Sequence, residues 1–470
     1  MTLSKDLRTF LDQVRKLGPE FYVEVNRKLS PELEVQVIQQ KLAKDGRFPV
    51  IYCPEIEGSK LPLVTDLVGS HEMVGLAFGI DPKEVATDKD KIFFEYRRRG
   101  GEGKPVKTVS SSSAPVKEVV LKGKDIDLGL LPIPKHAPLN SGRYISVGQM
   151  VCRDPSTGIY NSGIYRHEVK GKDKLGAKVN PVKHAAYAWR QYGDLSKPME
   201  VVIFIGHHPA TALGSCWNGG MDDDELEIMG GYLGEPLEVT QGETVDLPVP
   251  AHAEIAIEGI IDTSREYTDG PFSEWAGYYG EKKDCYLIQV TAITMRHDAI
   301  YHDLDPSHWE HNLLGTLGIQ STAYDAVKKV VPSVKSVYLP PSGGGFITCY
   351  ISIKKRVPGE AKRAGWAAVN SYLSTHIAIV VDEDIDVYNE EEVLWAVATR
   401  CCPDIDIDII PRTVGGPLVP TSYDETRLKR GRMASKMVID ATMPVELPFP
   451  TRIRPPEDLW ERIKLSEYLK

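Results

Sequence analysis

The sequence lacks both an apolar run long enough to cross a bilayer and a framework of cysteines. A transmembrane helix needs about 20 mainly apolar residues, and no stretch of this 470-residue chain approaches that length. The seven cysteines are dispersed and include no CxxC pair, which favours reduced thiols over disulfides or a zinc site. Residues 1–6 turn polar at once, without the apolar core of a signal peptide. We therefore expect a cytoplasmic protein without a membrane partner.

The chain also lacks an excess of positive charge, because its 56 Lys and Arg residues are outnumbered by 66 Asp and Glu residues. The formal net charge is −10, whereas a nucleic-acid binder needs a concentrated cationic face that releases counterions. We therefore expect no nucleic-acid partner, although a local cationic pocket for one phosphate stays compatible with this balance. The chain also lacks a GxGxxG or P-loop fingerprint and an internal repeat.

The composition that remains is that of a globular protein, with 42% hydrophobic and 26% charged residues. The length predicts two or three domains. Near the N-terminus, apolar residues at helical spacing predict helices over 5–18 and 33–44, and strands are expected at 48–52 and 61–64. The Ser-rich stretch 110–115 has the composition of a linker.

The middle of the chain is rich in expected strands that follow one another without a helix between each pair. This order favours a closed or split β-barrel over a doubly wound sheet. Helices interrupt it near 180–193 and 223–232. The clearest strands are expected at 144–151, 199–205, 254–261 and 286–295.

The last third alternates helix and strand, which predicts an α/β domain. Asn389 and Glu392 have the spacing of a capping box that opens one of its helices. The predicted class is α+β, with an N-terminal α/β unit, a central split β-barrel that binds flavin and a C-terminal α/β domain that makes oligomers. The expected boundaries are 1–112, 113–315, a linker helix at 316–335, 336–445 and a tail at 446–470. Within the last domain, helices are expected at 321–331 and 359–373 and strands at 346–355 and 377–382.

One stretch, residues 266–275, brings two acids together around a turn. Asp269 and Glu274 flank Gly270–Pro271, which breaks regular structure. Aromatic residues surround the acids, and two acids in different surroundings can take different catalytic roles. A solvated surface turn is the alternative interpretation, because Asp, Gly and Pro are ordinary turn residues.

Five segments in a fixed order resemble those of a known family. They are 160–167, 181–184, 225–235, 266–275, and 382–388 with 394–396 and 399–400 behind it. Together they resemble the UbiD family of prenylated-FMN-dependent decarboxylases, in its branch that acts on aromatic and heteroaromatic acids. The resemblance spans roughly residues 10 to 445.

The resemblance implies a catalytic trio of Arg166, Asp269 and Glu274. Many relatives have Glu where Asp269 stands, so the reach of that side chain is shorter here by one methylene. An ordinary salt bridge is the structural alternative for Arg166.

The resemblance also implies that Asn161, His184 and Glu225 hold a divalent ion, usually manganese, against the cofactor phosphate, with potassium alongside. Oxygen and nitrogen donors of this kind suit Mn²⁺ or Mg²⁺. For His184 alone, a helix cap or a packing residue is the alternative. The implied cofactor contacts are Ile164, Tyr165, Arg166, Lys178, Val179, Asn180, Lys183 and His184. Residues 305–312 fall where relatives vary with substrate, so Glu310 and His311 are candidates for contacts with a ring substituent, unless this is a polar loop without such a role.

The size of the rate enhancement that an enzyme must supply favours an organic cofactor. A positioned acid contributes about 10²–10⁴-fold, while enzymes supply about 10⁶–10¹⁷-fold over the uncatalysed reaction. An electron sink must carry the difference when CO₂ leaves an aromatic ring, and the resemblance implies prenylated FMN in that role.

We therefore expect a reversible, non-oxidative decarboxylase of a small aromatic carboxylic acid, supplied with cofactor by a UbiX-type flavin prenyltransferase and assembled as a homodimer or homohexamer. An FMN-dependent oxidoreductase on a split barrel and a non-catalytic flavin-binding protein are the alternatives.

Overall fold

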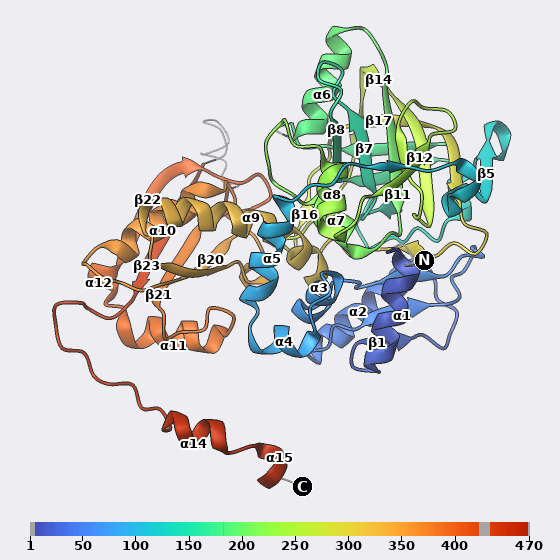
Figure 1. Cartoon of the computed structure of the whole chain (residues 1–470). Helices are drawn as coiled ribbons and strands as arrows, with labels where there is room; N and C mark the ends of the chain where they lie inside the picture. The colour runs from blue at the N-terminus through green and yellow to red at the C-terminus, as the bar shows by residue number, and fades with distance from the viewer. Residues whose placement is uncertain (1–4, 182, 423–432, 469–470) are drawn as a thin grey trace.

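The computed structural model describes residues 5–181, 183–422 and 433–468, so Val182 of the resembling segments lies outside it. The fold is α+β, as predicted. Figure 1 shows a C-terminal α/β domain on one side and the barrel with the N-terminal unit on the other, with helix α9 (Trp309–Val330) between them. Among the described residues, no helix combines the length and apolar character that a membrane crossing requires.

The N-terminal unit begins with the predicted amphipathic helix. Its residues Leu7, Phe10, Leu11 and Val14 are buried, and Asp6 caps the helix by accepting from the backbone amide of Thr9 at 2.8 Å. The unit comprises α1 (Leu7–Leu17), β1 (Tyr22–Glu24), α2 (Glu34–Lys44), β2 (Val50–Cys53), β3 (Leu63–Thr65), α3 (His71–Ala77), α4 (Pro82–Thr87) and α5 (Asp90–Gly100). Its sheet has the order β1-β2-β3-β18, and β18 (Tyr301–His302) comes from beyond the barrel.

The predicted split barrel is confirmed. Nine strands form one sheet of order β6-β9-β10-β17-β14-β11-β7-β8, with β5 paired to β17, and every pairing in it is antiparallel. Its strands are β5 (Val119–Lys122), β6 (Tyr144–Ile145), β7 (Gln149–Arg153), β8 (Tyr160–Ile164), β9 (Arg166–Gly171), β10 (Lys174–Lys178), β11 (Met199–Ile205), β14 (Ile255–Asp269) and β17 (Lys283–Met295). Helices α6 (His184–Asp194), α7 (Pro209–Ser215) and α8 (Glu225–Leu233) lie along the left of the barrel in Figure 1.

Two small sheets complete this part of the chain. One has the order β13-β12-β4 and the other joins β15 to β16. The Ser-rich stretch that has the composition of a linker joins β4 to β5 but is packed, because Ala114 and Val116 are buried and the amide of Val116 donates to the carbonyl of Ala251 at 3.1 Å. The strands are β4 (Lys107–Thr108), β12 (Glu238–Gln241), β13 (Pro248–Pro250), β15 (Phe272–Ser273) and β16 (Tyr279–Gly280).

The C-terminal domain is a sheet covered on both faces. Its order is β19-β20-β21-β23-β22, in which β20, β21 and β23 are parallel. Ile351 and Ile353 pack with α9 and α10, whereas Tyr350 points to the face covered by α11. The elements are β19 (Val334–Tyr338), β20 (Thr348–Ile353), α10 (Glu360–Ser371), β21 (Ile377–Asp382), α11 (Glu390–Arg400), α12 (Pro403–Asp406), β22 (Ile407–Val414) and β23 (Met433–Ala441).

Two local predictions are wrong in this domain. Helix α9 begins at Trp309, twelve residues before the predicted start at Ser321. The capping box at α11 does not form: Asn389 caps the amides of Glu391 and Glu392, but the Glu392 carboxylate accepts from the amide of Asp386 at 3.2 Å instead of reaching back to Asn389.

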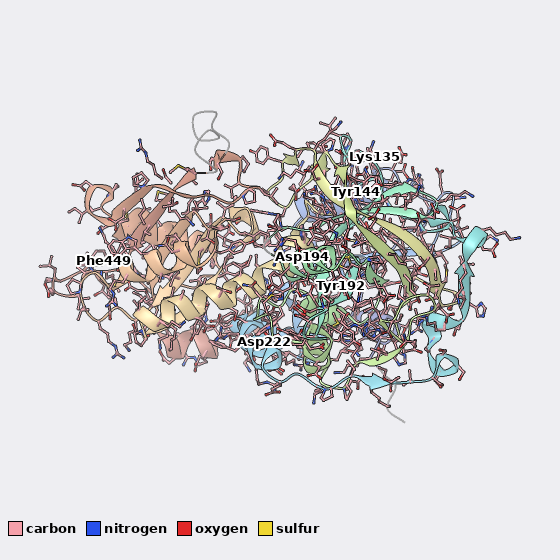
Figure 2. The ribbon with its side chains drawn as sticks, turned by 90° about the horizontal axis from the view of Figure 1, so that it is seen from above. Lys135, Tyr144, Tyr192, Asp194, Asp222 and Phe449 are labelled. Atoms are coloured by element: carbon pink, nitrogen blue, oxygen red, sulfur yellow. The ribbon has the colours of Figure 1, made fainter. Side chains whose placement is uncertain are left out.

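The tail carries α14 (Glu457–Arg462) and α15 (Leu465–Tyr468) and leads away from the body. In the view from above, Phe449 of the tail lies at the opposite end of the molecule from Lys135 and Tyr144 of the barrel part (Figure 2).

Candidate active site and metal centre

Arg166 is held between the two acids of the 266–275 stretch. It opens β9, while Asp269 ends β14 and Glu274 follows β15. Its Nε and Nη2 donate to Asp269 Oδ2 at 3.0 Å and 2.5 Å, and its Nη1 donates to Glu274 Oε1. The guanidinium carbon lies 4.4 Å from the ring centroid of Phe272. The side chain of Asp269 is 0% exposed and that of Arg166 is 11% exposed, so the solvated surface turn is excluded.

The electrostatics of this group follow from the contacts. Burial opposes the charge on Arg166, but the nearby carboxylates of Glu274 and Asp269 outweigh burial, so the pKa of Arg166 is raised. The guanidinium therefore stays charged, with donors fixed in a plane that suits carboxylate recognition.

The turn that carries Glu274 is fixed by the segment before β6. Asn140 Oδ1 accepts from the amide of Ser273 at 2.8 Å, and the amide of Ser141 donates to the carbonyl of Pro271 at 3.0 Å. The amide of Glu274 donates to the carbonyl of Tyr278 at 2.9 Å. These bonds fix the backbone that carries the Glu274 carboxylate, directly after β15.

The three predicted metal ligands converge from three elements. Asn161 lies in β8, and His184 and Glu225 begin α6 and α8. Glu225 Oε1 accepts from Asn161 Nδ2 at 3.0 Å and lies 3.5 Å from His184 Nδ1. Across the described residues, no three His, Cys, Asp or Glu side chains gather as a metal site, so the amide oxygen of Asn161 is needed to complete this set.

The Asn161–His184–Glu225 set contains a buried carboxylate oxygen without a partner, which is what a cation-binding site requires. The Oε2 of Glu225 is buried and finds no hydrogen-bonding partner among the described residues. Burial raises the pKa of Glu225, and the nearby His184 and Asn161 only partly offset that effect. A divalent cation would satisfy the free oxygen, and the positive ends of α6 and α8 favour a phosphate beside it. The residues present therefore fit the implied metal and cofactor phosphate.

A cavity of about 540 Å³ lies beside Arg166 and is of the size that small-molecule sites have. Of the predicted cofactor contacts, Ile164, Tyr165, Arg166, Lys178, Asn180 and Lys183 lie on its wall. Val179 is buried and His184 joins the metal set, without lining the cavity.

The two candidate substrate residues lie in different surroundings. His311 lines the cavity. Glu310 does not line it: its side chain accepts from the backbone amides of Asp66 and Val68 at 2.9 Å each, and it holds the N-terminal unit to α9. Direct contact between Glu310 and a substrate does not fit this position, because both carboxylate oxygens are already engaged inside the protein.

Several residues of the wall were missed by the sequence. Ser146, Lys283, Leu304 and Pro306 line the cavity with Phe272 and Trp275, and Pro417 and Leu418 of the C-terminal domain complete it. Lys283 could have been found, because its strand β17 pairs Lys283 with Asp269 across the hairpin. Phe272 and Trp275 stand in the 266–275 stretch and Pro306 in the 305–312 segment, whereas Ser146, Leu304, Pro417 and Leu418 belong to no segment that the sequence singles out.

Comparison with known proteins gives three domain matches that together cover most of the chain. Residues 20–89, 107–308 and 312–441 match the N-terminal, Rift-related and C-terminal domains of 3-octaprenyl-4-hydroxybenzoate carboxy-lyase. Among curated proteins, the chain is 31% identical over 440 residues to anhydromevalonate phosphate decarboxylase of Methanothermobacter thermautotrophicus, covering 93% of this chain and 97% of that protein.

Solved structures agree with these matches. The UbiD-class enzyme HmfF from Pelotomaculum thermopropionicum, in complex with FMN, superposes with a TM-score of 0.90 at 34% identity over 99% of this chain and 100% of its own. A dimeric evolved form of HmfF is in complex with prenylated FMN, with a TM-score of 0.86 at 34% identity over 99% of this chain and 100% of its own. Vanillic acid decarboxylase of Sedimentibacter hydroxybenzoicus matches with a TM-score of 0.87 at 30% identity, over 99% of each chain.

Proposed function

Because this chain belongs to the UbiD family, whose members are decarboxylases that use prenylated FMN, we propose that it removes CO₂ from an aromatic or heteroaromatic carboxylic acid, reversibly and without net oxidation. The observation that carries the proposal is the sharing of Arg166 between Asp269 and Glu274 at the wall of a cavity of about 540 Å³.

Each residue of this group has a role in the proposal. Arg166 binds and orients the substrate carboxylate through its planar donors. Asp269 is buried behind it and fixes its orientation. Glu274 lies on the cavity wall and delivers the proton that replaces CO₂ on the ring. When bound, the prenylated flavin supplies the electron sink that the departing carboxyl group requires.

The residues that would hold the cofactor follow from the donor set. Asn161, His184 and Glu225 would hold Mn²⁺, or another divalent ion that prefers oxygen and nitrogen donors. Lys178 and Lys183 supply positive charge toward the phosphate. A potassium ion beside the divalent ion, and delivery of the flavin by a UbiX-type prenyltransferase, remain predictions from the family.

The aromatic substrate is supported by the wall of the cavity. Phe272, Trp275, Leu304, Pro306 and Leu418 offer apolar surface on which a planar ring can pack. The name of the archaeal relative gives a phosphorylated substrate, whereas the name of the Sedimentibacter relative gives a phenolic acid. The apolar wall favours the second kind of substrate.

The proposal is tested with protein produced alongside a flavin prenyltransferase and offered a panel of aromatic acids. Glu274→Gln is expected to abolish both CO₂ release and exchange of solvent deuterium into the product. Glu281→Gln, an exposed acid of the same hairpin, is the matched control and should retain both. Wild-type rates in Glu274→Gln would refute the assignment of the proton donor.

A further inference from the structure

The hairpin that carries Glu274 spans the boundary between two domains. Its base is held by the barrel, because the amide of Ser273 donates to Asn140 Oδ1 at 2.8 Å. Its tip belongs to the other side, since Trp275, directly after Glu274, is buried in the hydrophobic cluster of the C-terminal domain. Among the described residues, the rest of that cluster, apart from Ala276, comes from α9 and the C-terminal domain. The residue next to the proposed proton donor is therefore anchored outside the barrel.

Phe346 provides the surface on which Trp275 rests. The two ring centroids lie 4.5 Å apart and the ring planes meet at 67°, which is the edge-to-face geometry that aromatic pairs prefer. The ring of Phe346 also lies against the backbone of α9, since a Cβ on Gly315 would stand 2.8 Å from Phe346 Cζ. Glycine at this position of the helix thus leaves the room that the ring occupies.

The backbone of Phe346 is fixed from the core of the C-terminal domain. Its carbonyl accepts from Thr375 Oγ1 at 3.0 Å, and the carbonyl of Thr375 accepts from Nζ of the buried Lys436 at 2.8 Å. Lys436 lies in β23, which is an inner strand of the sheet. The surface that supports Trp275 is therefore part of that sheet's core and not of the barrel.

A displacement of Trp275 is passed on to Glu274 because the two residues share one tight turn. The amide of Glu274 donates to the carbonyl of Tyr278, and the carbonyl of Glu274 accepts from the amide of Gly277, both at 2.9 Å. The side chain of Glu274 also lies against the opposite strand of the hairpin, where a Cβ on Gly280 would stand 2.7 Å from Glu274 Oε1. The turn and the carboxylate therefore move together.

We propose that Phe346 is a positioning residue for Glu274: through Trp275, the C-terminal domain sets how far the Glu274 carboxylate reaches into the cavity. This inference rests on the proposed function, in which Glu274 delivers the proton. A misplacement of a reacting group by about 1 Å can cost roughly 100-fold in rate. When the tip of the turn loses its support, the acid no longer keeps the distance that proton delivery requires.

Two substitutions change the support of Trp275 without altering the cavity wall, which Phe346 and Gly315 do not line. Phe346→Leu keeps an apolar side chain but removes the ring that Trp275 contacts. Gly315→Ala favours the helix but places a methyl group where the ring lies, so it tests the same contact without weakening α9. Ile353→Val, in the same cluster at the far end of β20, is the control for a general loss of packing.

The first measurement needs neither substrate nor cofactor. Amide hydrogen exchange of residues 272–280, followed by mass spectrometry on the full chain, reports how often the hairpin opens. Phe346→Leu and Gly315→Ala are both expected to speed this exchange by about 10-fold or more, while Ile353→Val should leave it at the wild-type rate. Unchanged exchange in both variants would overturn the inference, whichever acid the enzyme takes.

The second measurement is CO₂ release by the loaded enzyme. Phe346→Leu and Gly315→Ala should each lower kcat by roughly 10- to 100-fold and change KM by less than about 3-fold, because the wall that binds the acid stays intact. The solvent deuterium isotope effect on kcat should rise in both variants, since proton delivery becomes the slow step. In the double variant, the effect of Gly315→Ala should largely vanish, because the ring that it displaces is absent.

The two proposals fail differently. Wild-type rates in Glu274→Gln, or no CO₂ release from any acid, contradict the proposed function, and the exchange measurement then decides on Phe346 by itself. An inactive Glu274→Gln combined with a wild-type kcat or an unchanged isotope effect in Phe346→Leu overturns the positioning role alone. An equal loss of kcat in Ile353→Val would also overturn it, because a general loss of packing would then explain the effect.

Discussion

Two donors of Arg166, Nε and Nη2, converge on one oxygen of Asp269, Oδ2. The other oxygen of Asp269, Oδ1, is buried and has no hydrogen-bonding partner among the residues described. Arg166 therefore provides most of the stabilisation that the buried Asp269 carboxylate would otherwise receive from water. The third donor of Arg166, Nη1, remains for Glu274, so Asp269 sets the direction in which Arg166 points.

Asp269→Asn should therefore uncouple Arg166 from its position while keeping the shape of the side chain. Removing one partner of a buried ion pair costs about 3 kcal/mol of the free energy of unfolding, which urea denaturation can measure. We expect kcat to fall at least 10-fold as well, because Arg166 no longer orients the carboxylate. Asp284→Asn, an exposed neighbour on β17, is the control. Unchanged stability and kcat in Asp269→Asn would contradict the positioning role.

Glu225→Gln should reduce bound metal and, with it, retained flavin. The substitution removes the charge that a divalent ion would balance, and we expect roughly 100-fold weaker metal binding. Metal content by mass spectrometry and flavin content by absorbance check this on purified protein, before and after chelation. Glu227→Gln lies two residues further along α8 and is exposed. If both variants keep wild-type metal and flavin, the Asn161–His184–Glu225 set is not the metal centre.

Acid should destabilise the fold through buried neutral histidines. Burial, helped by nearby Lys89, lowers the pKa of His71 from 6.5 to about 3. The unfolded chain therefore binds a proton between these values and the folded chain does not. Stability is complete above pH 6.5 and falls as the pH drops toward 3, by about 1.4 kcal/mol per pH unit for each such histidine. Burial also lowers the pKa to about 3 for His167, His207 and His208.

The measurement is the free energy of unfolding at pH 7.5, 6.5 and 5.5. His71→Phe should reduce the slope of the free energy of unfolding against pH by the contribution of one proton. Phe suits this site because it lies between the rings of Tyr338 and Tyr388, whose centroids are 5.7 Å and 5.6 Å from that of His71. His297→Phe, on the surface, should leave the slope as it was. A slope identical in all three proteins would show that His71 is charged in the fold.

The tail should contribute to association between copies of the chain. Its root is fixed, because Arg452 lies 4.3 Å over the ring of Trp395 and pairs with Glu392 at 2.9 Å. Beyond the root, apolar side chains face solvent: Ile453 is 98% and Trp460 73% exposed. We predict that these side chains pack against another copy of the chain, within the homodimer or homohexamer that the family resemblance leads us to expect.

Trp460→Ser combined with Ile463→Ser should lower the mass measured by light scattering on a sizing column, with little change in thermal stability. Glu461→Ser, on the same exposed turn, is expected to keep the wild-type mass. An unaltered mass in the double variant would show that these tail residues do not contribute to association.

The sequence could predict what is local. Gly270–Pro271 marks a turn by its backbone chemistry, and Asp269 and Glu274 are found with it. Arg166, however, is separated from Glu274 by 108 positions, and no periodicity connects β9 with that hairpin. Only the resemblance placed the three side chains together, and the same holds for Asn161, His184 and Glu225.

The start of α9, the position of Glu310 and part of the cavity wall could not be predicted from the sequence. Asn312, Thr316 and Gln320 are buried although they are polar. The apolar stripe of Leu313, Leu314 and Leu317 is therefore short and mixed with polar residues, which hides the start of the helix. Glu310 was expected as a substrate contact because residues 305–312 fall where relatives of the resembling family vary with substrate. Its actual partners are backbone amides at residues 66 and 68, which no sequence pattern identifies. Likewise, Ser146 and Leu418 reach the cavity only through tertiary packing.

The presence of Pro417 and Leu418 on the cavity wall means that the reaction chamber is made of two halves from different domains. A change in how the two domains meet would therefore change the shape of this cavity directly. Asp90 of the N-terminal unit accepts from Ser336 Oγ at 2.6 Å and from the hydroxyl of Tyr388 at 2.9 Å. It thus holds the C-terminal domain to the N-terminal unit, at a distance from the cavity. Substitutions at the contact between the domains can thus change turnover while Arg166 and Glu274 stay the same.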